Sequence, residues 1–225
     1  MLSRLLDHLG SELTLRDLFN YPTIAELAEL ADQHAGPAKA EQPITRVADA
    51  PDYPVSHAQR RLWVLDQLEG SAAYQMVTAL RVGGSIDVAG LRHALATVVN
   101  RHESLRTCFV ERDGELRQRV VDVPVPPFTH VDLSSEADPR AAAKARAFRD
   151  AQQAFDLAQA PLLRVQLLRL GEQEHVLLFN LHHIVSDGWS MDVLVHELML
   201  SYRQFVDGTD ETLPPLALQH RDYVA

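Results

Sequence analysis

The chain has 225 residues, of which 46% are hydrophobic and 23% are charged, so it is able to bury the core of a globular protein. Its 31 Asp and Glu outnumber its 21 Lys and Arg, a formal net charge of -10 that argues against a nucleic-acid partner. Cys108 is the only cysteine, so an internal disulfide is excluded. The sequence has no apolar run of about 18 residues, which excludes a membrane span, and its acidic N-terminus excludes a signal peptide. We therefore expect a soluble cytoplasmic protein.

The first 35 residues have a helical pattern. Thr23 is placed as the N-cap of a helix and Glu26 completes a capping box. Residues 36–52 contain three prolines, Pro37, Pro43 and Pro51, and have no amphipathic period, which indicates an extended linker. We therefore divide the chain into a helical piece at 1–35, a linker at 36–52 and a larger domain at 53–225.

The larger domain alternates helices and strands, which predicts an α/β protein with helices packed on a sheet. Asp87 and Asp138 are placed as N-caps of two of its helices, and Asp113-Gly114 as the turn of a hairpin. In chain order we expect a helix at 56–70, a strand at 75–84, a helix at 85–105, a hairpin at 105–121, a helix at 137–155, two strands within 162–182 and a helix from about 189 to 206.

Two adjacent histidines end the strand 175–182, which is apolar at nearly every position and therefore predicted to be central and covered on both faces. Neighbouring residues on a strand point to opposite faces, so His182 and His183 should face different surroundings. Asp187 and Gly188 follow in the turn before the last long helix. This placement makes the turn a candidate site.

Three interpretations of these residues compete. A metal site is disfavoured, because two adjacent histidines and one aspartate supply too few convergent ligands. In a structural interpretation, Asp187 caps the following helix and the histidines are held by hydrogen bonds. In a catalytic interpretation, His183 is a general base for acyl transfer. The spacing alone leaves the last two open.

Three motifs in a fixed order resemble those of nonribosomal peptide synthetase condensation domains. "HHIVSDG" resembles the His-His-x-x-x-Asp-Gly motif, "SHAQRRLW" at 56–63 the family's first motif, and "RHESLRTCF" at 101–109 its second. The resemblance covers residue 53 to the C-terminus. Residues 1–35 are similar to the end of a peptidyl carrier domain, whose Leu-Phe-x-x-Pro-Thr-Ile-x-x-Leu-Ala pattern they match.

The resemblance implies a chloramphenicol-acetyltransferase-like two-layer sandwich lobe, the N-terminal half of a condensation domain, preceded by a carrier remnant without its phosphopantetheine serine. Asp222 and Tyr223 match part of the family's fourth motif, where the chain ends. We therefore expect a truncated fragment that lacks the C-terminal lobe, has little activity by itself and exposes an apolar interface for that lobe.

The implied reaction joins two thioester-tethered groups: an aminoacyl amine attacks an upstream aminoacyl or peptidyl thioester and forms an amide. The resemblance makes His183 the catalytic histidine, as a base or as a positioning group, and His182 structural. It pairs Asp187 with Arg61 in a scaffold contact, and it leaves Gly188 to offer an amide near the reacting carbonyl. Ser186 and Trp189 are candidates for the substrate channel, although packing is the first expectation for Trp63 and Trp189.

No cofactor or metal is expected in the domain itself, because the substrates are carried on the 4'-phosphopantetheine of partner carrier domains. The implied partners are the upstream and downstream carriers, an adenylation domain and the other condensation lobe. The carrier-like N-terminus and "DGWSM" favour the L-to-L elongation subtype over epimerisation and starter domains. Two rival functions are a coenzyme A-dependent acyltransferase and a non-catalytic half-domain that only docks carriers.

Overall fold

The computed structural model describes residues 15–33, 44–123, 127–209 and 212–224, which fall into two compact units, 1–43 and 44–225. The described part of the first unit is helical, as predicted, with α2 (Leu15–Asn20) and α3 (Ile24–Gln33). The backbone N–H of Glu26 donates to Thr23 Oγ1 (3.3 Å), and the backbone N–H of Thr23 donates to Glu26 Oε2 (3.2 Å). This is the predicted capping box. Residues 1–14 and 34–43 of the predicted segments lie outside the described residues.

A four-stranded sheet forms the centre of the second unit, in the order β2 (Gln75–Gly83), β7 (Glu174–His182), β6 (Leu163–Arg169) and β5 (Phe128–Asp132). The pairs β2–β7 and β7–β6 are antiparallel, whereas β6–β5 is parallel. The register places Gln75 opposite His182, so the strand that ends in the histidine pair is flanked along its length by two other strands. This confirms that β7 is central.

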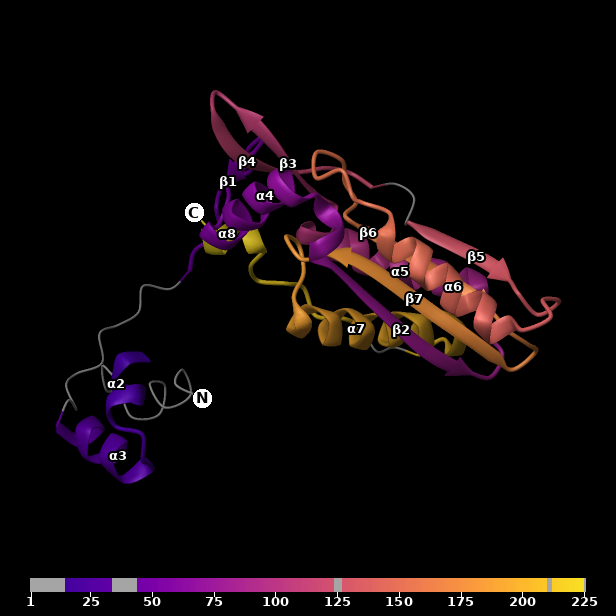
Figure 1. Cartoon of the computed structure of the whole chain (residues 1–225), viewed down its shortest axis with the longest axis horizontal. Coiled ribbons are helices and arrows are strands. Elements are labelled where there is room, and N and C mark those ends of the chain that lie inside the picture. The colour runs from indigo at the N-terminus through magenta and orange to yellow at the C-terminus, as the bar shows by residue number, and fades with distance from the viewer. Residues whose placement is uncertain (1–14, 34–43, 124–126, 210–211, 225) are drawn as a thin grey trace. The chain divides into compact units, whose positions relative to one another are not determined.

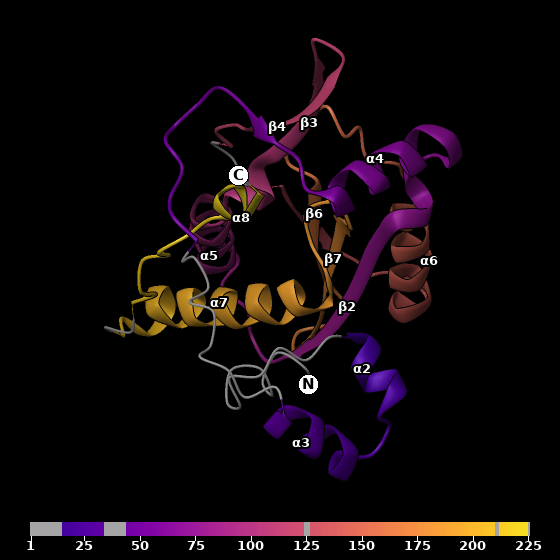
Figure 2. The same ribbon diagram turned by 90° about the vertical axis from the view of Figure 1, so that its left-hand side faces the viewer.

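Three helices cover the two faces of this sheet (Figure 2). Helices α5 (Val88–Arg101) and α7 (Gly188–Asp207) lie on one face, and α6 (Pro139–Gln152) lies on the other. Alternate residues of the central strands point towards α5 and α7, as a pleated strand requires: Leu163, Val165, Leu167, Leu177, Phe179 and Leu181. The intervening Leu168 and Val176 pack with α6 through Ala143. The α/β prediction is confirmed.

The remaining elements gather at the end of the sheet where β7 finishes (Figure 1). They are α4 (His57–Glu69), two short 3₁₀ helices η1 (Ser71–Tyr74) and η2 (Glu103–Arg106), α8 (His220–Val224), and a second sheet of β1 (Tyr53–Pro54), β4 (Glu115–Val120) and β3 (Thr107–Arg112). The hairpin β3–β4 turns at Asp113 and Gly114, both at positive φ, as predicted. Phe109, Leu116, Ile184 and Val185 form a core here that anchors the turn after β7.

The predicted linker is too long at its C-terminal end, because the second unit begins at Ile44. The N–H of Val47 donates to Asp222 Oδ1 (3.0 Å), and Arg221 donates to Asp49 Oδ1 (2.7 Å). Residues 44–52 therefore lie against α8 as extended chain. Hydrogen bonds to residues distant in sequence cannot be predicted from a proline-containing segment that has no periodic pattern.

Two helices leave large apolar residues exposed near their C-terminal ends. Leu68 of α4 is 76% exposed, and Phe205 of α7 is 47% exposed, although Met191, Leu194 and Leu198 of α7 are buried. Phe205 lies in the last turn of α7, where it contacts the ring of His93 on α5 at 4.9 Å instead of the sheet. Helical periodicity identifies a face but not how far along the helix that face remains covered.

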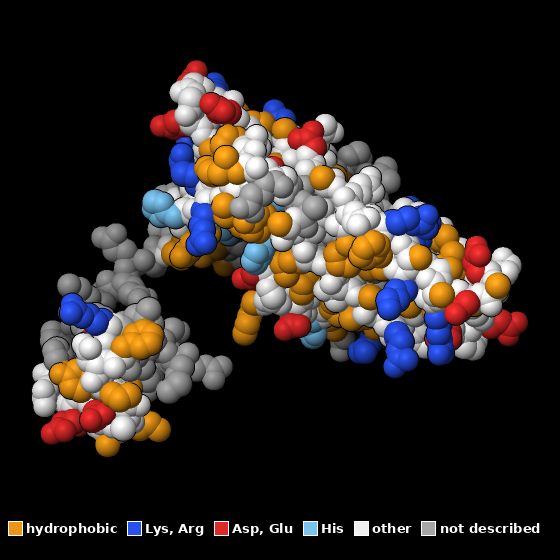
Figure 3. Space-filling view, in the orientation of Figure 1, with side chains coloured by type: hydrophobic (Ala, Val, Ile, Leu, Met, Phe, Trp, Pro, Cys, Tyr) orange, Lys and Arg blue, Asp and Glu red, His pale blue; other side chains and the backbone are white. Residues whose placement is uncertain are grey.

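Hydrophobic side chains reach the surface of the second unit in several separate places, as the space-filling view shows (Figure 3). Exposed residues of this kind include Val64 on α4, Phe148 on α6 and Trp189 at the start of α7. Scattered apolar residues are normal on a protein surface, whereas a contiguous patch marks an interface. The apolar interface expected for a second lobe therefore stays a prediction.

Candidate functional site

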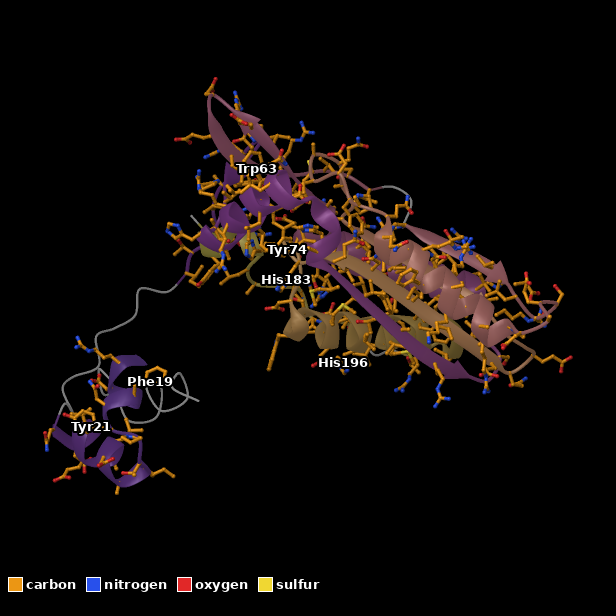
Figure 4. The ribbon with its side chains drawn as sticks, viewed as in Figure 1. Phe19, Tyr21, Trp63, Tyr74, His183 and His196 are labelled. Carbon is orange, nitrogen blue, oxygen red and sulfur yellow. The ribbon has the colours of Figure 1, made fainter. Side chains whose placement is uncertain are left out.

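The end of β7 is tied down on both sides by backbone hydrogen bonds. The N–H of His182 donates to Leu162 O (3.1 Å), and the N–H of His183 donates to Tyr74 O (2.9 Å). His182 is fully buried, whereas His183 is exposed. Figure 4 places His183 next to Tyr74, near the N-terminal end of α7. The two imidazoles therefore occupy different surroundings, as strand geometry predicts.

The buried imidazole of His182 has a structural setting. Its Nδ1 accepts the N–H of Ile184 (3.1 Å), so in the neutral ring the proton is on Nε2, which lies 3.8 Å from Asp66 Oδ1 on α4. Burial, with a smaller contribution from the charge of His183, lowers the pKa of His182 to about 4. His182 is thus neutral near pH 7 and holds the turn that carries His183.

The exposed imidazole of His183 is oriented by the backbone of its own turn. Its Nδ1 lies 2.7 Å from the carbonyl oxygen of Ser186. A carbonyl oxygen only accepts hydrogen bonds, so Nδ1 carries the proton and Nε2 of the neutral ring is left with a free lone pair. The turn therefore selects the tautomer in which Nε2 is a proton acceptor.

A cavity of about 260 Å³ lies against this imidazole. Its walls come from the first turns of α4 and α7, from the turn between β7 and α7, and from single residues of η2 and α8. It is lined by Ser56, Ala58, Gln59, Leu62, Ser104, His183, Ile184, Val185, Ser186, Asp187, Ser190 and His220. Residues of the first motif and of the histidine motif, more than 100 positions apart in sequence, thus form one site.

The predicted ion pair between Asp187 and Arg61 is wrong in this structure. Asp187 is the N-cap of α7, and its Oδ1 accepts hydrogen bonds from the N–H of Ser190 (2.8 Å) and from Ser190 Oγ (2.6 Å). These bonds lower the pKa of the Asp187 carboxyl. Arg61 is exposed on α4, and among the described residues no ion pair joins it to Asp187. The capping interpretation of Asp187 therefore holds.

The neighbours of the motif differ in how they fit their predicted roles. The backbone oxygen of Ser186 orients His183, while its own Oγ is buried without a hydrogen-bond partner among the described residues. Gly188 is the first residue of α7. A Cβ placed there would meet nothing within 4 Å, so steric contact with the surroundings does not require a glycine at this position. Trp63 packs in the core, as expected, but Trp189 is 79% exposed and does not.

The second motif organises the junction behind the site, and its central partner was not predicted. Glu197 of α7 is buried and accepts hydrogen bonds from Arg101 Nε (3.1 Å) and His102 Nε2 (2.6 Å). Glu103 pairs with Arg221 of α8 (3.0 Å). The position of Glu197 on the buried face of α7, next to Leu198, is the sequence signal that could have identified it.

The described residues form neither a metal site nor a membrane-spanning helix. No group of three or more His, Cys, Asp or Glu side chains within 15–33, 44–123, 127–209 and 212–224 could hold a metal ion. Over the same residues, none of the helices has the length and apolar character needed to cross a membrane.

Comparison with known proteins adds independent findings. The condensation-domain family model matches residues 50–225. A linear gramicidin synthase of Brevibacillus parabrevis is 42% identical over 229 residues, covering 100% of this chain and 3% of that protein. The dimodular nonribosomal peptide synthase of Bacillus subtilis (strain 168) is 38% identical over 226 residues, covering 99% of this chain and 9% of that protein. The chain thus spans a small part of these relatives.

Two solved structures are similar in fold. The starter condensation domain of rhizomide synthetase RzmA matches with a TM-score of 0.69 and 30% identity, over 73% of this chain and 40% of that one. The first condensation domain of the calcium-dependent antibiotic synthetase, in complex with a substrate analogue, matches with a TM-score of 0.68 and 28% identity, over 74% and 42% respectively.

Proposed function

This chain belongs to the condensation-domain family of nonribosomal peptide synthetases, and we propose that it supplies the histidine-bearing wall of a site that forms an amide bond between two carrier-tethered substrates. The observation that carries the proposal is the hydrogen bond from His183 Nδ1 to Ser186 O (2.7 Å), which leaves Nε2 free beside a cavity. A neutral imidazole held in this way suits the removal of a proton from an amine.

In the proposed reaction, the amine nitrogen of the acceptor attacks the carbonyl carbon of the donor thioester. The new C–N bond forms as the C–S bond breaks, the amine proton passes to His183 Nε2, and the departing thiolate takes up a proton. Two of the serines that line the cavity have other roles, since Ser56 caps α4 and Ser190 bonds Asp187. Direct transfer needs no acyl-serine intermediate, and much of the rate gain comes from positioning both substrates.

We propose further that parts of a condensation domain beyond these residues close the open side of this cavity, since the solved relatives extend well beyond the matched region. Both substrates would arrive on phosphopantetheine arms of carrier domains that work beside an adenylation domain. The match to the linear gramicidin synthase covers the whole chain, which supports a carrier-domain origin for residues 1–35. That origin and the "DGWSM" sequence support the L-to-L elongation subtype.

Single-turnover amide formation between two aminoacyl pantetheine thioesters tests the proposal, with these residues placed in a complete condensation domain so that the cavity is closed. The substitution His183→Ala should slow the reaction by about a hundredfold or more, the usual contribution of a general base. The matched control is His196→Ala, which removes an exposed histidine of α7 outside the cavity lining. A rate within about threefold of the unsubstituted chain for His183→Ala would exclude the catalytic role of this residue.

The same assay separates the rival functions. A carrier-docking half-domain would bind aminoacyl carrier proteins yet form no amide with or without His183. A coenzyme A-dependent acyltransferase would use an acyl-coenzyme A donor with a free amine and would need no carrier. The proposed function requires amide formation that depends on both His183 and a pantetheine-linked donor. An L-configured donor should react faster than its D enantiomer if the subtype is L-to-L.

A further inference from the structure

A second cavity lies beside that of His183, and we propose that it receives the apolar side chain of one of the two tethered amino acids. This inference rests on the proposed function and adds a substrate class to it: branched aliphatic or single-ring side chains. The cavity has a volume of about 150 Å³ and is lined by His102, Ser104, Leu105, Val185, Ser186, Trp189, Ser190, Val193 and Leu194.

Two walls form this cavity. One wall is formed by the first two turns of α7. There Val193 lies four residues after Trp189 and three after Ser190, so the three side chains are neighbours on the helix surface. The other is the junction between α5 and η2, which contributes His102 and Leu105. The cavity is therefore made by packing between elements that are far apart in sequence.

The two cavities are continuous in their lining. Ser104, Val185, Ser186 and Ser190 border both of them. A substrate whose reacting group lies at His183 is therefore able to place a side chain of a few atoms in the second cavity. The arrangement matches the chemistry of an aminoacyl thioester, in which the side chain branches one carbon away from the carbonyl group.

The lining favours an uncharged, apolar occupant. Leu105, Val185 and Leu194 form buried walls, at 5%, 9% and 4% exposure. His102 is the one titratable side chain in the lining, and it is already bonded to Glu197 (2.6 Å). A carboxylate or ammonium placed here would lose water without gaining a partner of opposite charge. The serines of the lining are small and uncharged, and a volume of about 150 Å³ is enough for a molecule as large as benzene.

The wall at the α5–η2 junction is held in place by hydrogen bonds to α7. Glu197 holds His102 and Arg101 together from within α7, so it ties the two walls of the cavity to each other. A preformed cavity loses little conformational entropy when it is filled. Trp189, which is 79% exposed, stands in the lining as a surface that an entering side chain would cover.

Binding of stable substrate mimics to the ¹³C-methyl-labelled 225-residue chain tests this inference. The probes are glycyl, leucyl and aspartyl derivatives of N-acetylethylenediamine, in which an amide replaces the thioester. Each is used with a free amine, to mimic the acceptor, and with an acetylated amine, to mimic the donor. The leucyl probe should bind about tenfold more tightly than the other two, and it should shift the methyl signals of Leu105, Val193 and Leu194.

Substitutions within the cavity should remove this preference without abolishing binding. Val193→Phe fills the cavity from a half-buried position and should lower leucyl affinity to that of the glycyl probe. Met199→Phe is the matched control, since Met199 lies on the same helix, is 41% exposed and is outside the cavity lining. Trp189→Ala changes an exposed residue that the fold tolerates, and it should reduce leucyl affinity alone.

The outcomes separate this inference from the proposed function. If the glycyl probe shifts the signals of Ile184 and Val185 while leucyl and aspartyl probes bind equally well, the side-chain cavity is overturned and the proposed function stands. Leucyl preference that survives Val193→Phe also overturns the cavity. If no probe binds, the side-chain cavity is overturned, and the proposed function is decided separately by amide formation with and without His183→Ala. A leucyl preference confined to one of the two amine forms identifies the substrate that uses the cavity.

Discussion

The substitution Asp187→Ala distinguishes a helix cap from a buried ion pair. In the structure, Asp187 Oδ1 accepts two hydrogen bonds from Ser190, at 2.8 Å from its backbone N and 2.6 Å from its Oγ. Loss of an N-cap of this kind costs about 1 kcal/mol of unfolding free energy. Asp187→Asn should cost much less, because asparagine caps helices as well as aspartate does. Arg61→Ala should change stability by no more than about 0.5 kcal/mol, because Arg61 is exposed.

Urea unfolding at pH 7, followed by circular dichroism, measures these differences. About 1 kcal/mol corresponds to a fall in Tm of roughly 2–4 °C for a unit of this size. The double variant with both Arg61→Ala and Asp187→Ala should be additive within about 0.5 kcal/mol. A loss of about 3 kcal/mol or more for Arg61→Ala, with a coupling energy above about 1.5 kcal/mol, would show that the two residues form a buried pair and would refute the cap.

The same variant has a pH dependence of known sign. Hydrogen bonds from Ser190 lower the pKa of Asp187 below its usual value in the unfolded chain. The stabilisation is therefore fully present above about pH 4 and is lost as the pH falls through the lowered pKa. The difference between Asp187→Ala and the unsubstituted chain should shrink in that acidic range, and a difference that grew there would contradict the sign.

Three further predictions concern buried groups around the site. Glu197→Ala should destabilise the chain by about 3 kcal/mol, since it strands Arg101 and His102, whereas Asp192→Ala on the exposed face of α7 should be close to neutral in urea unfolding. The pKa of His182 is lowered from 6.5 to about 4, so stability should be full above pH 6.5 and fall by about 3 kcal/mol towards pH 4. Urea unfolding at pH 7 and pH 5 measures this loss of stability. If the difference between the two midpoints is the same in His182→Gln as in the unsubstituted chain, the prediction is contradicted. Ser186→Ala should be neutral or slightly stabilising in thermal unfolding, since its buried Oγ has no partner among the described residues, and a loss above about 1 kcal/mol would reveal one.

Local signals in the sequence were sufficient for the elements that position the site. Asp87 and Asp138 cap α5 and α6 as predicted, because an N-cap depends only on residues within one turn. The central place of β7 followed from its nearly continuous apolar run, and the different surroundings of His182 and His183 followed from the period of a strand.

The features that the sequence did not reveal depend on contacts between distant residues. Strand β5 (Phe128–Asp132) is a short, largely exposed edge strand that exists through its parallel pairing with β6. Residues 44–52 are extended chain, and they are held in place by hydrogen bonds to distant residues: the N–H of Val47 donates to Asp222, and Arg221 donates to Asp49. Glu197 lies on the buried face of α7, but its partners Arg101 and His102 are almost 100 positions away in sequence, so the pattern does not identify them. Such partners are selected by tertiary packing, which local patterns do not encode.

His183 lines a cavity, and its catalytic role stays a prediction of the motif resemblance, whereas Asp187 caps α7 instead of pairing with Arg61. Asp187 satisfies two patterns at once, as a motif residue and as an N-cap, and its neighbour Ser190 lies within reach without any rearrangement. The local hydrogen bonds therefore determine its role in this structure.

The tautomer of His183 is the most direct test of the account. Long-range ¹H–¹⁵N correlation spectra of the ¹⁵N-histidine-labelled chain near pH 8, with His183→Gln used to assign the signals, distinguish the two ring nitrogens. The structure predicts a protonated Nδ1, held by Ser186 O at 2.7 Å, and an unprotonated Nε2. A ring that carries its proton on Nε2 would leave no lone pair towards the cavity and would contradict the proposed role of His183 as the proton acceptor in amide formation.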